Sequence, residues 1–355
     1  MALRRERLLR NVGYLLGALA LLGLAAFLMR EPEAPRLQRK ALEFPRYPRS
    51  HEIERRETRK TLALPAPRPN DGGATAEPAE AEAPRPLADP VLVALASPDD
   101  MAFVLEAGAL KDSPLGRMLL ACQSPEALAE IERFEQRSGF RPLEQLERIG
   151  MTTHDGQPVM VLSGDFSSFD PSFSAPGQAV TNVGNARVLD SEGASIAVWK
   201  GQMLVIGEPS GVHSAIDRLE GASPATASFQ SDEAYGEMYG SLSGESLSRL
   251  LPEDLRDQLW GAADRVLLHV DATDDLLLVA DVSGRDAAKL ADLSRAVAGA
   301  LSLGRLGAVR EDDQLLADLL DESRVIPSEG SFQLEVALPL SSVERQLGEC
   351  AKAAR

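Results

Sequence analysis

An uncharged apolar segment near the start of the chain constrains its fold more than any other feature. Residues 12–29 are eighteen consecutive residues without a charge or a proline, and most are Leu, Ala or Gly. As a helix rising about 1.5 Å per residue, the segment would be roughly 27 Å long, close to the hydrocarbon thickness of a bilayer. Four arginines precede it. The sequence therefore predicts one transmembrane helix over residues 12–29, which would bind the lipid bilayer, after a basic tail at residues 1–11.

The end of this segment indicates that it is retained rather than cleaved. A secretory signal peptide has a shorter apolar run and a small-residue cleavage site, whereas this run ends in Phe27-Leu28-Met29-Arg30. We expect a signal anchor in a bacterial inner membrane. The arginines of the tail favour a periplasmic C-terminal domain under the positive-inside rule. Ten basic residues between 30 and 60 leave the opposite orientation, with a cytoplasmic domain, open.

Residues 30–88 have the composition of a linker. Ten prolines lie between positions 32 and 86, and Ala and Glu are abundant from residue 63 onward. Low apolar periodicity together with high Pro and Glu content is typical of disorder, although residues 52–61 would suit a short helix. A coil of this length would span roughly 40 Å. We expect a disordered linker that holds the folded part clear of the bilayer.

Charge is distributed unevenly along the chain. Residues 1–60 contain 14 Lys and Arg against 7 Asp and Glu, whereas residues 61–355 contain 23 against 47. A domain this acidic repels phosphate backbones, and aromatic residues are only 5% of the chain, too few to favour base stacking. These features argue against nucleic acid as a partner of the domain.

The remaining residues predict an α+β fold with antiparallel sheets and packed helices. Asp155-Gly156 between apolar runs is a strong hairpin signal, and residues 265–282 and 324–338 read as two further hairpins. Residues 286–303 carry an amphipathic helical stripe, while residues 91–95 read as a strand. A strand–proline–helix pattern ending at Pro209 is repeated at Pro339. This echo suggests two related tandem halves, residues 89–225 and 226–355.

The chain has two cysteines, Cys122 and Cys350, and no CxxC motif. This spacing provides neither a zinc site nor a thioredoxin-like motif. Outside the cytoplasm the two residues would form a disulfide that closes nearly the whole domain. The alternative is two unpaired cysteines.

Residues 165–184 interrupt the regular pattern of strands and helices. They are rich in Ser, Pro and Gly and contain Phe166, Phe169 and Phe173. Long loops in compact domains are often functional, so the three phenylalanines are candidates for contact with a partner. The alternative is a loop excursion that packs a phenylalanine into the core.

The sequence shows no catalytic, cofactor-binding or metal-binding motif. It has no phosphate-binding loop, no HExxH and no serine at the centre of a nucleophile elbow. His269 lies within an apolar strand and reads as a core residue. Asp271, Asp274 and Asp275 lack the spacing of a calcium loop and suit a turn. His154-Asp155 with Ser163 is a weak hydrolase constellation, because adjacent His and Asp side chains in a turn point apart.

In its layout the chain resembles bacterial single-pass membrane proteins of unknown function with an extracytoplasmic α+β domain. The resemblance lies in the order of anchor, Pro/Ala linker and domain, in Ser97-Pro98-Asp99-Asp100, and in the endings at Pro209 and Pro339. It implies no activity or site. We expect a membrane-tethered, non-enzymatic domain that acts through protein contacts in the cell envelope. The alternative is an extracytoplasmic hydrolase whose site is assembled from residues far apart in the sequence.

Overall fold

The computed structural model describes residues 44–58, 89–96, 101–174, 178–225, 233–246, 261–310 and 314–347. Within these ranges helices are mixed with antiparallel strands, which confirms the predicted α+β class. The chain divides into two compact units. Unit 1 consists of Met1–Arg49, Val104–Glu132 and Ala234–Arg355, and unit 2 of Ser50–Phe103 and Arg133–Glu233.

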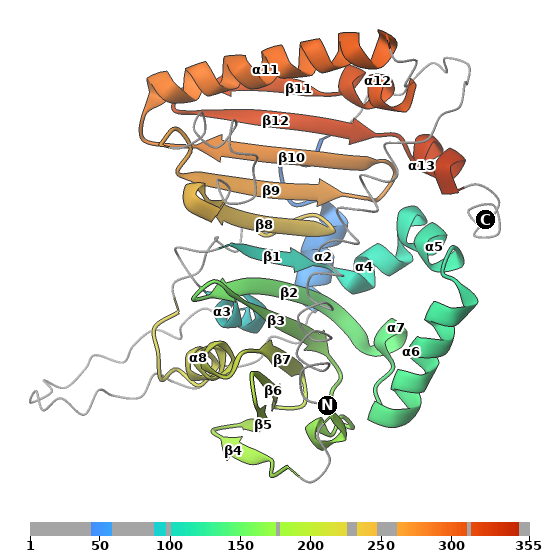
Figure 1. Cartoon of the computed structure of the whole chain (residues 1–355), viewed down its shortest axis with the longest axis vertical. Coiled ribbons are helices and arrows are strands. Elements are labelled where there is room, and N and C mark those ends of the chain that lie inside the picture. The colour runs from blue at the N-terminus through green and yellow to red at the C-terminus, as the bar shows by residue number, and fades with distance from the viewer. Residues whose placement is uncertain are drawn as a thin grey trace, which may run out of the picture. The chain divides into compact units, whose positions relative to one another are not determined.

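Unit 1 is built on antiparallel strands in the order β11-β12-β10-β9-β8 (Figure 1). Their bounds are β8 Met238–Ser243, β9 Arg265–Asp271, β10 Leu276–Ser283, β11 Arg324–Ser328 and β12 Ser331–Leu338. The predicted hairpins β9–β10 and β11–β12 are thereby confirmed. In the register of the sheet Val279 pairs with both His269 and Glu335. Because directly opposite residues of antiparallel strands share a face, His269 and Glu335 lie on the same face of this sheet.

Helices cover one side and one end of this sheet. The long helix α11 (Ala287–Arg310) and helix α12 (Gln314–Asp321) pack against β12, and α11 also runs along β11 (Figure 1). Helix α11 continues seven residues beyond the predicted end at Leu303. The helices α4 (Ala107–Asp112), α5 (Pro114–Ala121) and α13 (Leu340–Leu347) complete the unit. Leu115 and Met118 of α5 share an apolar cluster with Val343 of α13, which fixes the two helices beside each other.

Unit 2 has its own antiparallel order, β2-β3-β7-β6-β5-β4. The strand bounds are β2 Leu146–His154, β3 Gln157–Gly164, β4 Thr181–Val183, β5 Ala186–Ser191, β6 Ala194–Trp199 and β7 Met203–Gly207. Its helical elements are α2 (Ser50–Thr58), α3 (Pro90–Ala94), α7 (Pro142–Gln145), η1 (Pro171–Ser174) and α8 (Pro209–Leu219). Strand β1 (Ala102–Leu105) and helix α6 (Pro125–Ser138) each contain a point where the chain passes from one unit to the other.

The alternation of side chains gives the sheet of unit 2 two apolar faces. Helix α8 packs on β6 and β7 and buries Val212, Ile216 and Leu219. On the other face Val198 and Leu204, which are cross-strand partners in β6 and β7, join an aromatic cluster. A sheet covered on both faces needs apolar residues at successive positions, and β7 (MLVIG) has that composition.

The predicted hairpin β2–β3 is confirmed together with its turn. Asp155 and Gly156 both adopt positive φ, at 50° and 75°, as the two central residues of a type I′ turn require. Gly156 meets nothing within 4 Å of the Cβ position. Glycine is therefore favoured at this position because of the positive φ angle and not because a side chain would lack space.

The predicted strand at residues 91–95 is wrong, because α3 occupies Pro90–Ala94. The backbone nitrogen of Val91 donates to Asp89 Oδ1 at 2.9 Å, and Pro90 stands in the first turn, so the start signal of a helix precedes the apolar run. Arg218 of α8 closes the other end, donating to the carbonyls of Val93 at 3.2 Å and Ala94 at 2.7 Å. The local N-cap and the long-range contact from Arg218 together outweigh the β-propensity of the valines.

The prediction of a disordered linker over residues 30–88 is wrong for residues 44–58, which are ordered and end in α2. The expected helix near residues 52–61 corresponds to α2. The proposed halves 89–225 and 226–355 also need correction, because Val104–Glu132 groups with the C-terminal residues in unit 1. Both strand–proline–helix endings are present, as β7–α8 and β12–α13. Whether the halves are related stays a prediction.

The predicted transmembrane helix at residues 12–29 lies outside the described residues, as do Ser97-Pro98-Asp99-Asp100. Among the helices that the structure does describe, none combines the length and the apolar character that crossing a bilayer requires.

Candidate functional site

The clearest candidate site lies where residues 44–49 cross the sheet of unit 1. We call this segment (FPRYPR) the strap. Arg46 Nη2 donates to Glu335 Oε1 of β12 at 2.9 Å, and Arg49 Nη2 lies 3.0 Å from Asp271 Oδ2 of β9. In Figure 1 the blue chain leading into α2 passes behind these strands. The two arginines thus hold a segment from the predicted linker against the folded sheet.

The register explains why one short segment reaches both carboxylates. Asp271 and His269 alternate by two residues on β9 and therefore share a face. That face also carries Glu335, through Val279 of β10. Strands β9 and β12 are separated by β10 alone, so the acids stand on the order of 10 Å apart across the sheet. Three residues of extended chain, the spacing from Arg46 to Arg49, match this separation.

Glu335 is the electrostatic centre of the site. Its side chain is 0% exposed, whereas those of its partners Arg46 and Arg324 are 49% and 54% exposed. Arg324 lies directly opposite Glu335 in the β11–β12 pairing and binds Oε2 through Nε. A buried carboxylate without such partners would cost several kcal/mol. Two guanidinium groups on one carboxylate leave this cluster with one positive charge in excess.

Aromatic residues contribute to the outer surface of the strap. The Arg324 guanidinium carbon lies 5.0 Å from the centre of the Phe44 ring, a distance at which cation–π attraction operates. Tyr47 is 78% exposed. The strap and Arg324 line a shallow hollow of about 430 Å³. The site therefore presents guanidinium and aromatic groups outward and directs its ion pairs inward.

Asp271 and its neighbours are engaged in structural contacts rather than arranged around a metal. Asp271 Oδ1 accepts from the backbone nitrogen of Thr273 at 2.9 Å, in addition to the Arg49 contact, and Asp275 Oδ1 accepts from that of Leu340 at 2.8 Å. Within the described ranges no group of His, Cys, Asp or Glu has the geometry to hold a metal ion. The turn interpretation of these aspartates agrees with the hydrogen bonds.

His269 is a core residue, as predicted. It is 2% exposed, and its ring stacks on that of Tyr235 at 3.8 Å with an interplanar angle of 2°. Beside it, Tyr239 donates to Glu106 Oε1 at 2.9 Å, and Glu237 Oε2 accepts from the backbone nitrogen of Ala272 at 2.9 Å. The buried acids of unit 1 therefore stabilise its fold.

The prediction that phenylalanines of the loop at residues 165–184 contact a partner is wrong for Phe166 and Phe169, because both side chains are buried. Phe166 is 0% and Phe169 is 2% exposed. Phe166 stacks on Phe140 with ring centres 4.5 Å apart, and Phe169 meets Phe166 edge-on at 6.2 Å. Burying aromatic rings in this way releases far more free energy than exposing them in a loop. Phe173 lies in η1, and the position of its side chain lies outside the description.

Cys122 lies at the C-terminal end of α5 and is disulfide-bonded. Cys350 lies outside the described residues, so the pairing of Cys122 with Cys350 stays a prediction. Helix α13, whose last residue Leu347 precedes Cys350 by three positions in the sequence, shares an apolar cluster with α5.

A serine, an aspartate and a histidine meet in unit 2, but in an order unsuited to hydrolysis. Ser195 Oγ donates to Asp190 Oδ1 at 2.6 Å, and His213 Nε2 lies 3.2 Å from Asp190 Oδ2. In a serine hydrolase the imidazole stands between the serine and the carboxylate, whereas here the carboxylate stands between them. The Ser195 hydrogen bond is the main cause that lowers the pKa of Asp190, so this carboxylate is a weak base.

The constellation of His154, Asp155 and Ser163 is not assembled. His154 pairs with Gln157 at the turn of the β2–β3 hairpin, whereas Ser163 pairs with Arg148 at the opposite end. His154 Nε2 lies 3.7 Å from Asp155 Oδ2. This hairpin therefore separates the histidine from the serine that hydrolysis would require.

Glu220, which follows α8, is a buried carboxylate of unit 2. It is 7% exposed and accepts from Trp199 Nε1 at 2.7 Å and from the backbone nitrogen of Asn185 at 3.0 Å. Burial by itself raises the pKa of Glu220, but the hydrogen bonds from Trp199 and Asn185 and the charge of Lys200 hold that pKa below its usual value. Glu220 thus stays ionised while joining α8 to the sheet.

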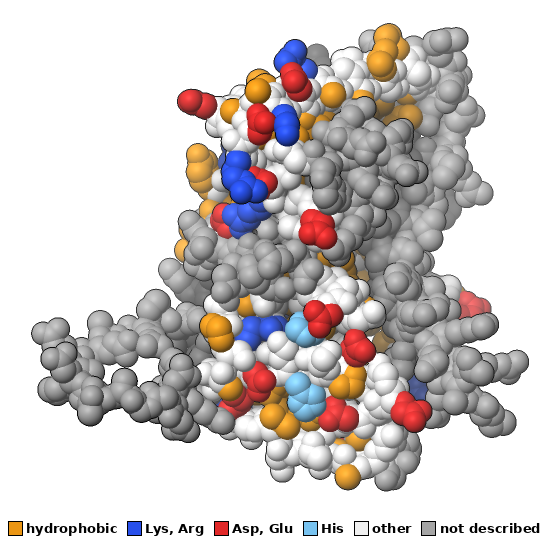
Figure 2. Space-filling view, turned by 60° about the vertical axis from the view of Figure 1, so that its left-hand side comes forward, with side chains coloured by type: hydrophobic (Ala, Val, Ile, Leu, Met, Phe, Trp, Pro, Cys, Tyr) orange, Lys and Arg blue, Asp and Glu red, His pale blue; other side chains and the backbone are white. Residues whose placement is uncertain are grey.

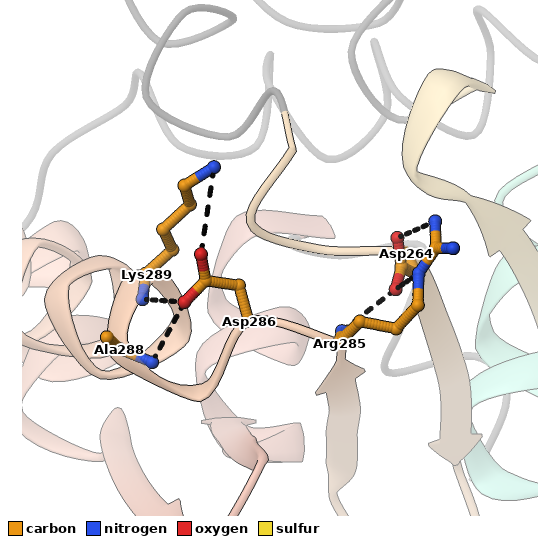
Figure 3. Close-up of polar contacts among 5 residues, drawn as sticks. All are labelled: Asp264, Arg285, Asp286, Ala288 and Lys289. Carbon is orange, nitrogen blue, oxygen red and sulfur yellow. Dashed lines mark hydrogen bonds and ion pairs between the residues drawn. The ribbon is translucent and has the colours of Figure 1, made fainter.

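The N-terminus of α11 is occupied by protein groups (Figure 3). Asp286 Oδ1 accepts from the backbone nitrogens of Ala288 and Lys289, both at 3.1 Å. Arg285 Nε donates to Asp264 Oδ2 at 3.0 Å, and this hydrogen bond is the main cause that lowers the pKa of Asp264. The capping carboxylate takes the place that a bound anion would need.

Several exposed basic side chains in the described part of the chain pair with acidic ones. Examples are Arg285 with Asp264, Lys289 with Asp286, and Arg141 with Glu144. Figure 2 shows a face on which basic side chains lie beside acidic ones and histidines lie among acidic side chains. On this face the described residues form no extended basic patch of the kind that binds nucleic acid.

Sequence reasoning missed the strap because its signals are weak when read alone. Arg46 and Arg49 lie three residues apart, each directly after a proline, and Glu335 is the one charge within an apolar strand, FQLEVAL. A lone acid at an inward position of a strand predicts a buried partner, since it cannot stay buried unpaired. The sequence does not reveal which of the 37 Lys and Arg residues that partner is.

Comparison with known proteins gives similarity at the level of structure alone. No protein-family model matches the chain, and no curated protein matches it. Crystal forms III and I of TP0453 are similar at 11% identity with TM-scores of 0.41, covering 72% and 74% of this chain and 96% and 98% of that chain. Crystal form IV has 12% identity and a TM-score of 0.43, covering 75% of this chain and 95% of that chain.

Proposed function

We propose that this chain is a membrane-tethered, extracytoplasmic, non-enzymatic domain of the bacterial envelope that acts through protein contacts. The observation that carries the proposal is the strap. The segment that follows the predicted anchor is joined to unit 1 by the Arg46–Glu335 and Arg49–Asp271 pairs. A linker that served only as a flexible spacer would not need ion pairs with buried carboxylates at this point.

The strap shortens the predicted tether. Phe44 belongs to the folded part, so the tether between the span ending at Met29 and the domain comprises residues 30–43. These fourteen residues reach at most about 50 Å when fully extended, and a coil of that length averages about 20 Å. The average of about 20 Å is shorter than the roughly 40 Å expected from a coil of residues 30–88. The domain would stand at the bilayer rather than clear of it.

The acidic surface supports a protein partner over nucleic acid. Residues 61–355 carry 47 acidic against 23 basic residues, which repels polyanions. Leu303 and Leu306, one turn apart on α11, are 71% and 63% exposed. Exposed leucines on a helix whose opposite side packs on the sheet are well placed for contact with another protein.

The anchor and its orientation are tested on the full chain. Cells producing the wild type are compared with cells producing the double variant Leu16→Arg and Leu22→Arg, which puts two charges into the predicted span. We expect the wild type in the membrane fraction and the variant in the soluble fraction, because a charge at mid-bilayer costs about 2.5–3.5 kcal/mol. Protease added to spheroplasts should digest the domain. If the domain were protected from the protease, it would lie on the cytoplasmic side of the membrane instead.

The partner contact is tested by photo-crosslinking in the same cells. A photo-reactive amino acid at Leu303 should give one discrete crosslinked species of higher mass, identified by mass spectrometry. The matched control places the same group at Glu192, an exposed residue in the β5–β6 turn. Equal and diffuse labelling at both positions would argue against a specific protein contact at α11.

A further inference from the structure

The outer surface of the strap has an arrangement that its inward ion pairs do not explain. Glu335 offers one oxygen to Arg46 and the other to Arg324. Each guanidinium has five N–H donors, and both side chains are about half exposed, at 49% and 54%. Tyr47, which lies between Pro45 and Pro48 in the sequence, is 78% exposed. Positive charge, donors and an amphipathic ring thus face solvent together.

This surface differs in sign from most of the domain. The cluster of Arg46, Arg324 and Glu335 carries one excess positive charge, whereas residues 61–355 have more than twice as many acidic as basic residues. A planar guanidinium binds phosphate oxygens in bidentate fashion. Tyrosine is enriched at the level of lipid headgroups, where its ring and its hydroxyl each find a suitable medium.

Chain length determines what can reach this surface. Under the proposed function, on which this step rests, the bilayer ends near Met29, and Phe44 begins the strap. A tether of fourteen residues keeps the strap within about 50 Å of the headgroups, and short tethers of this kind give millimolar effective concentrations. A headgroup contact whose dissociation constant lies below that concentration would then be mostly occupied.

We propose that the exposed surface of the strap, formed by Arg46, Tyr47 and Arg324, binds anionic lipid headgroups and lays unit 1 on the bilayer. The guanidinium groups bind headgroup phosphates while their inward donors stay on Glu335. The Tyr47 ring enters the interfacial layer. The acidic remainder of the domain is repelled by the same anionic surface, so the strap also selects the orientation of unit 1.

The test uses the full chain in vesicles of phosphatidylcholine with or without phosphatidylglycerol. Tyr47→Trp places a fluorophore on the strap, and Leu303→Trp places a matched fluorophore at a similarly exposed position on α11. Subtracting the parent protein removes the signals of Trp199 and Trp260. With lipids that carry a quencher at headgroup level, we expect several-fold stronger quenching at position 47 than at position 303. That difference should fall on the order of fivefold without phosphatidylglycerol.

Vesicle flotation of the parent protein separates failure of this inference from failure of the proposed function. A chain that does not float with either vesicle overturns the membrane tether itself. A chain that floats but shows equal quenching at positions 47 and 303 overturns the headgroup contact and leaves the tether intact. Arg46→Gln gives a further check, because it should weaken quenching at position 47 in anionic vesicles alone. An equal loss in both vesicles would also overturn the inference.

Discussion

Both units bury a carboxylate, but they satisfy it in different ways. In unit 2 Glu220 accepts hydrogen bonds from Trp199 and Asn185, which lie 21 and 35 residues away. In unit 1 Glu335 binds Arg324, 11 residues away, and Arg46, 289 residues away. Glu220 is thus held by neutral donors from nearby strands, whereas Glu335 is held by full charges and by a segment from the start of the chain.

The contacts of Glu220 stabilise the fold of unit 2, whereas the Arg46–Glu335 pair attaches the N-terminal segment to unit 1. Neutral local donors stabilise a fold whatever happens to the rest of the chain. A charge pair across 289 residues makes the stability of unit 1 depend on where its N-terminal segment lies. Under the proposed function, unit 1 is therefore the unit suited to connect the predicted anchor with the domain. The following variants test this distinction.

The largest effect is expected from the predicted Cys122–Cys350 disulfide, which joins two segments of unit 1 and closes a loop that also contains Arg133–Glu233 of unit 2. Cys350→Ser should lower the unfolding free energy of unit 1 by roughly 5 kcal/mol in the chain-entropy model, because the closed loop is long. Segment-resolved hydrogen exchange should show faster exchange in β9 and β10 and little change in β3 and β7. Ser341→Ala, an exposed change on α13, is the control. Two titratable thiols in the unfolded, unreduced protein would refute the pairing.

Phe166→Ala should act on unit 2 instead. Removing a ring that is fully buried among Phe140 and Phe169 creates a cavity that costs about 3–5 kcal/mol. Urea unfolding followed through the buried Trp199 should shift accordingly, while exchange in β9 and β10 stays unchanged. Phe166→Leu, which keeps most of the volume, should recover much of the loss. Unaltered stability would restore the idea of an exposed partner loop.

Glu335→Gln should loosen the strap. The amide keeps the shape of the side chain but loses the charge that holds Arg46 and Arg324. Because both arginines are half exposed, the unfolding free energy of unit 1 should fall by only about 2 kcal/mol. Trypsin should then cleave faster after Arg46 and Arg49. Glu329→Gln, an exposed change in the turn of the same hairpin, should leave cleavage as in the wild type. Equal cleavage in both variants would mean that Glu335 does not hold the strap.

The smallest effect concerns Glu220 and acidic pH. Its pKa is held below the usual 4.5 in the folded state, so its stabilising contribution is present above about pH 4.5 and is lost as pH falls through the folded-state pKa. Glu220→Gln should cost about 1 kcal/mol at neutral pH and flatten this acid dependence. Unfolding curves monitored by Trp199 between neutral and acidic pH measure both effects. Glu192→Gln should keep the dependence of the wild type.

Local chemistry made much of the fold predictable. Asp155-Gly156 identified the β2–β3 hairpin, because few residue pairs adopt two successive positive φ angles at low cost. Amphipathic periodicity identified α11, and apolar runs identified the hairpins of both sheets. The strand predicted at residues 91–95 failed because Asp89 and Pro90 start a helix whose C-terminal carbonyls bind Arg218, a residue far along the chain.

The candidate site could not be predicted in the same way. Its contacts join residues 44–49 to β9 and β12, and no local pattern encodes which arginine meets which acid. The loop phenylalanines show the opposite error. The composition around Phe166 and Phe169 is that of a loop, but burial is decided by Phe140 and by the sheet of unit 2. Long-range packing determined both outcomes.

The separation between Arg46 and Glu335 also orders events during synthesis. At about 5–20 residues per second, the ribosome reaches Glu335 about 15–60 s after it has made Arg46. The last segment of unit 2 ends at Glu233, so that unit is complete while β11 and β12 have yet to be translated. A chain truncated before β12 has no Glu335 to receive the strap. The Arg46–Glu335 contact therefore forms only after β12 has been translated, so docking of the strap is completed only with the final hairpin of the domain.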